Sequence, residues 1–265
     1  DSPKVMGIVN TTPDSFYSRS RTLASEVVEK VGKMLEEGAD FVDVGGYSTR
    51  PGAVAVSEKE EIKRVVPIIE LLLKYYPNLL ISVDTFRSEV ARQSLSSGAA
   101  LVNDISAGNL DPQMWEIVAA YQVPYIAMHM QGTPQTMQQY TAYDDIVKQM
   151  LYYFSKRKAM ANSYGINDFI IDPGFGFSKT LAQNYEILRK LPLFSTLDSP
   201  MLVGVSRKSM LYKLLGIDAT QALNATTVVN TLAISYGANI LRVHDVKEAR
   251  QCVQIFSKMI SGNPV

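Results

Sequence analysis

The stretch Gly38-Ala39-Asp40-Phe41-Val42-Asp43-Val44-Gly45-Gly46 contains the pattern that decides the fold. A glycine ends the preceding helical pattern, and a short run rich in β-branched and apolar side chains then predicts a buried strand. The start of the stretch returns as Gly98-Ala99-Ala100-Leu101 and as Gly237-Ala238-Asn239-Ile240. The sequence is therefore organised around a repeated junction between a helix and a strand.

Eight short apolar runs alternate with longer amphipathic stretches along the whole chain. The runs span residues 5–9, 41–44, 79–83, 101–103, 125–128, 169–171, 201–205 and 240–243, and helical patterns between them include 23–37, 58–76, 88–97, 143–164, 181–190 and 224–236. Glycine and proline alternate as the residue type shortly before successive runs. Eight βα units in about 250 residues predict a single (β/α)8 barrel, or TIM barrel, as one domain over residues 1–265. An open doubly wound sheet is the alternative.

Composition excludes several classes of protein. The 265 residues include 26 basic and 26 acidic side chains, and 46% are hydrophobic, which excludes a disordered chain. A membrane span needs about 20 continuous apolar residues, and no such run is present. The zero net charge gives no indication of a nucleic-acid or membrane partner. The one cysteine, Cys252, lies in a helical pattern, and residues 1–10 show no signal-peptide pattern, so a reducing, cytoplasmic location is expected.

Polar residues stand at the end of nearly every run. They are Asn10, Asp43, Asp84, Asn103, Asp104, His129, Asp172, Ser206, Arg207, Lys208, Arg242 and His244. A barrel carries its active site at the carboxyl ends of its strands, so these side chains are expected to meet at one mouth. Their chemistry predicts hydrogen-bond acceptors for a donor-rich ring and cations for an anion. Zinc-protease, paired-cysteine, phosphate-loop and nucleophile-elbow motifs are absent from the sequence.

The motifs at these positions resemble the dihydropteroate synthase family. They are Met6-Gly7-Ile8-Val9-Asn10-Thr11-Thr12-Pro13-Asp14-Ser15-Phe16, Asp43-Val44-Gly45-Gly46-Tyr47-Ser48-Thr49-Arg50-Pro51-Gly52, Ser82-Val83-Asp84-Thr85, Asn103-Asp104-Ile105, Met128-His129-Met130-Gln131-Gly132, Asp172-Pro173-Gly174-Phe175-Gly176-Phe177, Ser206-Arg207-Lys208-Ser209 and Arg242-Val243-His244-Asp245. The resemblance implies a barrel-shaped transferase of folate biosynthesis, a sulfonamide target. Its reaction joins 6-hydroxymethyl-7,8-dihydropterin diphosphate to p-aminobenzoate and releases pyrophosphate in a dissociative step.

The resemblance also implies roles for individual residues in pterin binding. Asp172 would accept from the 2-amino and N3–H groups, and Asp84 would accept from N8–H. Asn103 would bind the neighbouring ring nitrogen, and Lys208 would donate to the 4-oxo group and N5.

At the other end of the substrate, Arg242 and His244 would bind the diphosphate, and Asn10 would be a ligand of Mg²⁺. The residues implied for p-aminobenzoate are Thr49, Arg50, Pro51, Phe175, Lys208 and Ser209. Asp14 would help to close the site, and it joins Arg50, Lys208, Arg242 and His244 as the expected catalytic set. A homodimer is expected from the same resemblance.

Two segments depart from the commonest family pattern. Residues 17–21 read Tyr-Ser-Arg-Ser-Arg where Ser-Asp-Gly-Gly is common, and Tyr47 stands where glutamate is frequent. Two other functions share the pterin motifs. A pterin-binding methyltransferase domain would not need Arg50, Lys208, Arg242 and His244, and a silent paralogue is expected to have lost some of them.

Overall fold

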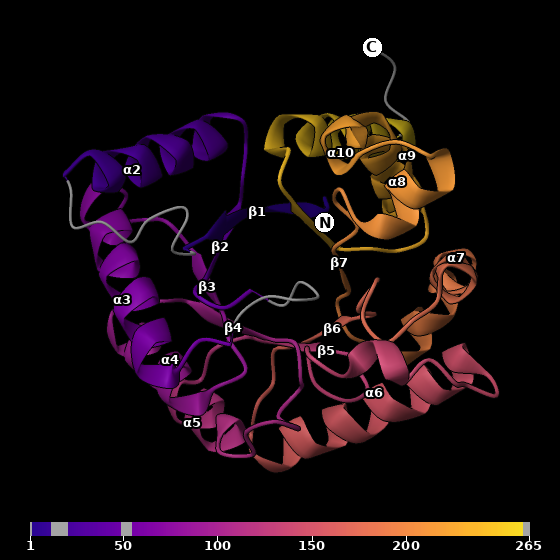
Figure 1. Ribbon diagram of the computed structural model, residues 1–265, viewed down its shortest axis with the longest axis horizontal. Coiled ribbons are helices and arrows are strands. Elements are labelled where there is room, and N and C mark those ends of the chain that lie inside the picture. Colours follow the sequence, from indigo (N-terminus) through magenta and orange to yellow (C-terminus); the bar gives the residue numbers. More distant parts are fainter. Residues whose placement is uncertain (1, 12–20, 49–54, 262–265) are drawn as a thin grey trace.

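Eight parallel strands form a barrel in the computed structural model, which describes residues 2–11, 21–48 and 55–261 (Figure 1). The strands are β1 Lys4–Asn10, β2 Phe41–Gly45, β3 Ile81–Asp84, β4 Leu101–Asp104, β5 Tyr125–Met128, β6 Phe169–Asp172, β7 Leu202–Val203 and β8 Ile240–Val243. They are ordered β6-β5-β4-β3-β2-β1-β8-β7, and a bridge between Ile171 and Met201 joins β6 to β7. The predicted barrel is confirmed, and the doubly wound alternative is wrong because the strand order never reverses.

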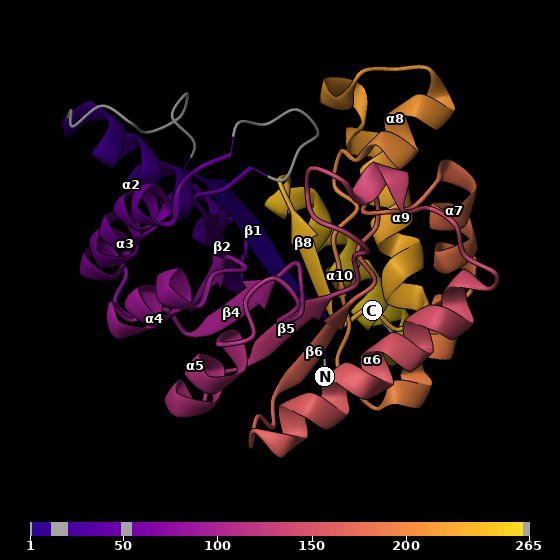
Figure 2. The same ribbon diagram turned by 60° about the horizontal axis from the view of Figure 1, so that its bottom comes forward.

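Helices cover the outside of the barrel, as Figures 1 and 2 show from two directions. They are α2 Arg21–Glu36, α3 Glu58–Tyr75, α4 Ser88–Ser96, α5 Met114–Tyr121, α6 Ile146–Ser163, α7 Leu181–Arg189, α8 Ser209–Leu215, α9 Leu223–Ser235 and α10 Val246–Ser261. Short 3-10 helices span Met137–Gln139, Leu191–Leu197 and Ala219–Gln221. None of the helices in the described ranges is long and apolar enough to cross a membrane.

The junction seen in the sequence is a recurring helix terminator. Gly38, Gly98, Gly165 and Gly237 have φ values of +98°, +101°, +78° and +99°. At the first of them, the amide of Gly38 donates to Leu35 O (3.0 Å) and the amide of Ala39 donates to Met34 O (2.9 Å). This bond pair defines a Schellman motif, which favours glycine because its left-handed backbone disfavours a side chain. The motif turns the chain into every even-numbered strand.

β7 is shorter than the predicted run of residues 201–205. The amide of Met201 donates to Asn239 Oδ1 (2.8 Å), so a side chain replaces the ladder bond there. At the other end, Val205 O accepts from the amide of Lys208 (3.1 Å) in a turn. Only Leu202 and Val203 remain in the named strand.

Apolar side chains fill the inside of the barrel at the amino-terminal part of the strands. Met6, Leu101, Ile126, Ile170, Leu202 and Ile240, from six different strands, form one cluster of buried residues. Side chains two residues apart on a strand share a face. On β4, β6 and β8, the inward-facing residue two positions after the apolar one is polar. These residues are Asn103, Asp172 and Arg242. A polar layer therefore lies next to the apolar layer, toward the carboxyl ends of the strands.

Candidate active site

Arg242 is the centre of a polar network at the carboxyl ends of the strands. Its Nε donates to Asp43 Oδ2 at 2.6 Å, and its Nη2 donates to Asp84 Oδ2 at 2.7 Å. Asn103 Nδ2 donates to the same Asp43 oxygen at 3.1 Å. The strand register explains the meeting, because Gly45 pairs with Asp84 and Asp84 pairs with Asn103. Gly45 also leaves room, since a Cβ there would lie 3.2 Å from Asp84 Cβ.

Asp43 is a site residue to which the sequence reasoning gave no role. Its carboxylate is 1% exposed and receives hydrogen bonds from two predicted site residues through one oxygen. Within the described ranges, its other oxygen, Oδ1, has no hydrogen-bond partner. A carboxylate in the middle of an apolar run was the available signal, because a buried charge requires a partner. Asp43 fixes the positions of both Asn103 and Arg242.

Burial and neighbouring charges act in opposite directions on the pKa values of Asp84 and Arg242. Burial raises the pKa of Asp84 to about 7, although Arg242 opposes the rise. Burial acts to lower the pKa of Arg242, but the carboxylates of Asp43 and Asp84 outweigh it and raise that pKa above its ordinary value. The guanidinium is therefore a permanent cation, while Asp84 is a carboxylate whose proton affinity is unusually high.

Asp172 and Lys208 form the opposite side of the mouth. Asp172 is 6% exposed, and its Oδ1 accepts from the amide of Gly174 at 2.7 Å. Burial raises the pKa of Asp172, an effect that Lys208 opposes. Lys208 Nζ donates to Phe175 O at 2.5 Å and lies 5.0 Å from the ring centroid of Phe177. An acceptor and a cation thus face the same space.

The two phenylalanines of the β6–α7 loop have different environments. The Phe175 side chain, expected at the substrate, is completely buried in the main core between strands and helices. Its carbonyl oxygen, rather than its ring, contacts Lys208. Phe177 carries the ring that lies beside Lys208. The sequence could not separate them, because both phenylalanines stand in one short loop, each directly after a glycine with positive φ.

Lys179 is a second residue that the sequence reasoning missed. It is 4% exposed, and its ammonium donates to His129 O (3.1 Å), Gly174 O (2.9 Å) and Phe177 O (2.8 Å). Burial lowers its pKa to about 7, against the attraction of Asp172. Lys179 holds the ends of β5 and β6 in a fixed relation by these three bonds. A lysine in a loop is normally read as exposed, so the sequence gave no signal.

The remaining predicted residues lie around the rim or outside the described ranges. Asn10 is exposed at the end of β1, and Ser209 begins α8. His244 is exposed after β8, with Nδ1 2.9 Å from Ser206 Oγ. Asp14, Thr49, Arg50 and Pro51 lie outside the described residues, so their roles stay predictions.

Gly174 provides a direct test of the β6–α7 loop. Its φ is +68°, and a Cβ there would overlap the carbonyl oxygen of His129. We expect Gly174→Ala to lower the free energy of unfolding by about 3 kcal/mol or more, because the loop that holds Asp172 must shift. Gly165→Ala is the matched control: φ there is +78° and no atom lies within 4 Å of the added Cβ. Its expected cost is about 1 kcal/mol. Equal losses in urea denaturation would contradict the role of the close approach.

Comparison with known proteins gives consistent matches over nearly the whole chain. The family described as "Pterin binding enzyme" matches residues 6–244. A dihydropteroate synthase from Synechocystis sp. is 43% identical over 255 residues, covering 95% of this chain and 88% of that protein. The crystal structure of the Yersinia pestis dihydropteroate synthase with a sulfonamide drug complex has a TM-score of 0.92 and 39% identity, covering 98% of this chain and 95% of the other. The Xanthomonas albilineans dihydropteroate synthase with 4-aminobenzoic acid has a TM-score of 0.90 and 39% identity, covering 100% and 95%.

Proposed function

Because the chain belongs to the dihydropteroate synthases, a family of pterin-binding transferases, we propose that it joins 6-hydroxymethyl-7,8-dihydropterin diphosphate to p-aminobenzoate and releases pyrophosphate. One observation carries the proposal. The mouth of the barrel combines the acceptors Asp84, Asn103 and Asp172 with the cations Arg242 and Lys208. This pattern complements a substrate that has hydrogen-bond donors at one end and an anion at the other.

Pterin recognition follows from the chemistry of the acceptors. A pterin presents its 2-amino and N3–H groups side by side, and one carboxylate can accept from both. Asp172 has this role in the proposal, with Gly174 N holding one of its oxygens. Asp84 would accept from N8–H while Asn103 binds the neighbouring ring nitrogen. Rings with a different order of donors would leave buried carboxylates without partners, which costs binding free energy.

The diphosphate would lie on the side of Arg242 and His244, where Mg²⁺ would be held by Asn10 together with phosphate oxygens. Among the described residues, no group of three or more His, Cys, Asp or Glu side chains could hold a metal ion. Mg²⁺ fits this poor donor set, because it keeps several waters and binds substrate phosphates through few protein oxygens. When bound, the ion would neutralise charge on the leaving diphosphate.

The bond-breaking step would be dissociative. The C–O bond to the diphosphate breaks first, and the electron-rich dihydropterin stabilises the methylene cation. The neutral amine of p-aminobenzoate then attacks this carbon and afterwards loses a proton. Arg242 is charged at every relevant pH and would stabilise the departing anion electrostatically. The proposal needs no strong general base.

Incubation of the protein with dihydropterin diphosphate, p-aminobenzoate and Mg²⁺ tests the function. We expect pyrophosphate and dihydropteroate to form in equal amounts. Formation of neither product across a range of substrate and metal concentrations would overturn the proposal. Sulfonamides are expected to compete with p-aminobenzoate, as the sulfonamide complex of the Yersinia pestis relative suggests. We also place the reaction in the cytoplasm and the protein in a homodimer, on the family resemblance and the buried thiol of Cys252.

The rate is expected to fall at alkaline pH through Lys208. Burial lowers the pKa of Lys208 to about 8, against the attraction of Asp172. The side chain is a cation below this pKa and neutral above it, so its bonds to the pterin weaken as pH rises through about 8. We expect kcat/KM for dihydropterin diphosphate to fall by roughly tenfold per pH unit beyond that point.

Lys208→Arg should remove this alkaline limb, because arginine stays protonated, although kcat/KM at neutral pH should be lower. Lys213→Arg is the matched control, since Lys213 is an exposed lysine of the same helix region. A steep decline near pH 8 that persists in the Lys208→Arg variant would assign the limb to another group.

A further inference from the structure

Ser206 contacts both the backbone and the ring of His244. Its Oγ lies 2.9 Å from Nδ1 of the imidazole and also accepts a hydrogen bond from the amide of His244 at 3.1 Å. Ser206 lies shortly after β7 and is 5% exposed, whereas His244 directly follows β8 and is exposed. One buried hydroxyl therefore faces two polar groups of the same histidine.

These two contacts decide where the neutral imidazole carries its proton. A serine hydroxyl has one proton to donate, and a buried hydroxyl proton needs an acceptor. The amide of His244 can only donate, so it uses a lone pair of Ser206 Oγ. In the part of the chain that the structure describes, the other polar partner of this hydroxyl is Nδ1, so the hydroxyl donates to Nδ1. Nδ1 is then unprotonated, and the neutral ring carries its proton on Nε2.

The residues that follow Ser206 and His244 hold this contact in place. Arg207 Nε and Nη2 donate to the two carboxylate oxygens of Asp245 at 2.9 and 2.8 Å. The amide of Arg207 donates to Thr226 Oγ1 at 3.1 Å. Two consecutive pairs of residues therefore tie the chain after β7 to the chain after β8. The bonds of Arg207 do not use the hydroxyl of Ser206, so they remain when that hydroxyl is removed.

We propose that Ser206 is a positioning residue that holds His244 as the tautomer protonated on Nε2. This inference rests on the proposed function, in which His244 binds the diphosphate of the substrate. Phosphate oxygens accept hydrogen bonds, so an Nε2–H group would attract them, whereas the lone pair of an unprotonated Nε2 would repel them. The imidazole thus donates to the anion without having to carry a positive charge.

The position of the proton is measured by nitrogen-15 NMR of protein labelled in its histidine rings. The chain has two histidines, His129 and His244, and the spectrum of His244→Gln identifies the signals of His129. At about pH 9, where an ordinary imidazole is neutral, we expect Nδ1 of His244 to give the signal of an unprotonated nitrogen and Nε2 that of a protonated one. A protonated Nδ1 in the unaltered protein would overturn the inference.

Ser206→Ala is the decisive variant. It removes the hydroxyl while the bonds of Arg207 keep the turn in place. We expect the ring of His244 to become a mixture of both tautomers. The KM for dihydropterin diphosphate should rise about threefold to tenfold, the range expected for the net contribution of one hydrogen bond. The affinity for 6-hydroxymethyl-7,8-dihydropterin, which lacks the diphosphate, should stay within about twofold, because that ligand leaves His244 without an anion to bind.

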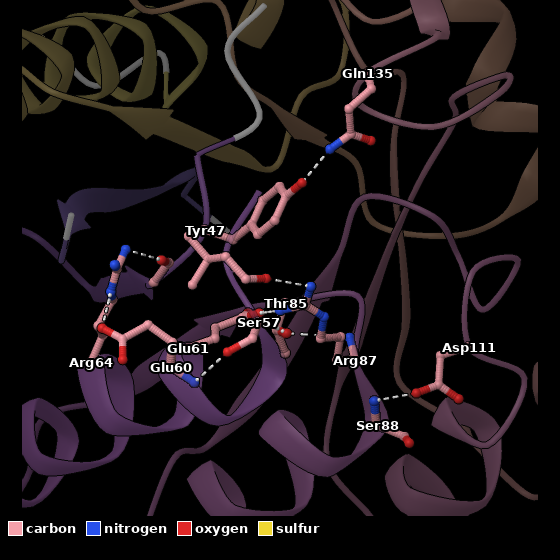
Figure 3. Close-up of polar contacts among 12 residues, drawn as sticks. Tyr47, Ser57, Glu60, Glu61, Arg64, Thr85, Arg87, Ser88, Asp111 and Gln135 are labelled. Carbon is pink, nitrogen blue, oxygen red and sulfur yellow. Dashed lines mark hydrogen bonds and ion pairs between the residues drawn. The ribbon is translucent and has the colours of Figure 1, made fainter. Parts of the chain in front are cut away.

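Ser57→Ala is the matched control. The Ser57 hydroxyl likewise accepts from a backbone amide, that of Glu60 at 3.2 Å, at the start of α3 (Figure 3). Its removal weakens the cap of α3, but the ring signals of His244 and the KM for dihydropterin diphosphate should not change. General destabilisation by the loss of a serine hydroxyl is thereby separated from an effect on the imidazole.

Two results with Ser206→Ala would contradict the inference. One is a set of His244 ring signals identical to those of the unaltered protein. The other is an equal loss of affinity for the dihydropterin with and without its diphosphate. Failure of the proposed function is distinguishable from both, because the ring signals are read without turnover. In that case the unaltered protein would form no dihydropteroate and would still show the Nε2-protonated ring.

Discussion

Replacing Asp172 by asparagine is expected to reduce kcat/KM for dihydropterin diphosphate by about a hundredfold to a thousandfold. A hydrogen bond to a charged group contributes about 1.5–3 kcal/mol, and the proposal has this carboxylate accept two. Asparagine replaces one acceptor by an NH₂ group, which would face a donor of the pterin. The remaining oxygen can still accept from Gly174 N, so the loop should keep its conformation.

Stability separates this effect from unfolding. Because burial disfavours the charged form of Asp172, a neutral asparagine should leave the free energy of unfolding unchanged or higher. Asp168→Asn is the matched control at the other, exposed end of β6, and its kinetics should equal those of the unaltered protein. Steady-state kinetics and urea denaturation measure both quantities. A loss of kcat/KM below about fivefold would contradict the role given to Asp172.

Replacing Arg242 by methionine is expected to lower the free energy of unfolding by about 3–5 kcal/mol and to abolish measurable turnover. Arg242 is the cation shared by Asp43 and Asp84, and its loss leaves a fully buried carboxylate without a charge partner. It also removes the cation proposed for the leaving diphosphate. Arg92→Met, at an exposed ion pair, should change the stability by less than about 0.5 kcal/mol.

A second substitution identifies the cause of the lost stability. Asp43→Asn combined with Arg242→Met removes the fully buried one of the two carboxylates that lose their cation, so the double variant should recover about 1–3 kcal/mol relative to Arg242→Met alone. Turnover should not return, because the cation is still missing. If the two substitutions destabilise the protein additively, the pairing of Asp43 with Arg242 does not account for the effect.

The fold could be predicted because the residues that end each helix and precede each strand act locally in the sequence. The glycines that open the even-numbered strands are required by backbone geometry within a few residues of each junction. A glycine shortly before the run therefore indicated four of the eight strands, and at three of them the residues that follow are also alike. Asp84, Asn103, Asp172 and Arg242 could be predicted as site residues for a related reason. Each lies at the end of a strand or beside it, where the barrel brings all such residues together.

The rest of the site depends on three-dimensional packing that a sequence does not display. Asp43 lies inside an apolar run on β2, and its partner Arg242 lies on β8, on the other side of β1, so only the closed barrel reveals the pair. Lys179 is recognised as buried only when its three backbone carbonyl partners are seen together. The departure at Tyr47 was visible in the sequence, but its contacts with Arg87 and Gln135 were not, because those residues belong to other strand–helix connections.

The junction between β6 and β7, where a single bridge joins Ile171 to Met201, has less backbone pairing than the junction between β1 and β2. β1 pairs with β2 over five residues, whereas β6 meets the two-residue β7 through this bridge and the bond from Ile171 N to Pro200 O. Local opening begins where the fewest backbone hydrogen bonds hold two strands together, so we expect β6 and β7 to separate first. Asp172 ends β6, on one side of this junction, and Lys208 follows β7, on the other side. Arg242, Asp43 and Asp84 lie on β8, β2 and β3, which β1 joins by continuous parallel pairing. Opening there would move Asp172 and Lys208 relative to each other, while the ion pairs of Arg242 with Asp43 and Asp84 would stay intact.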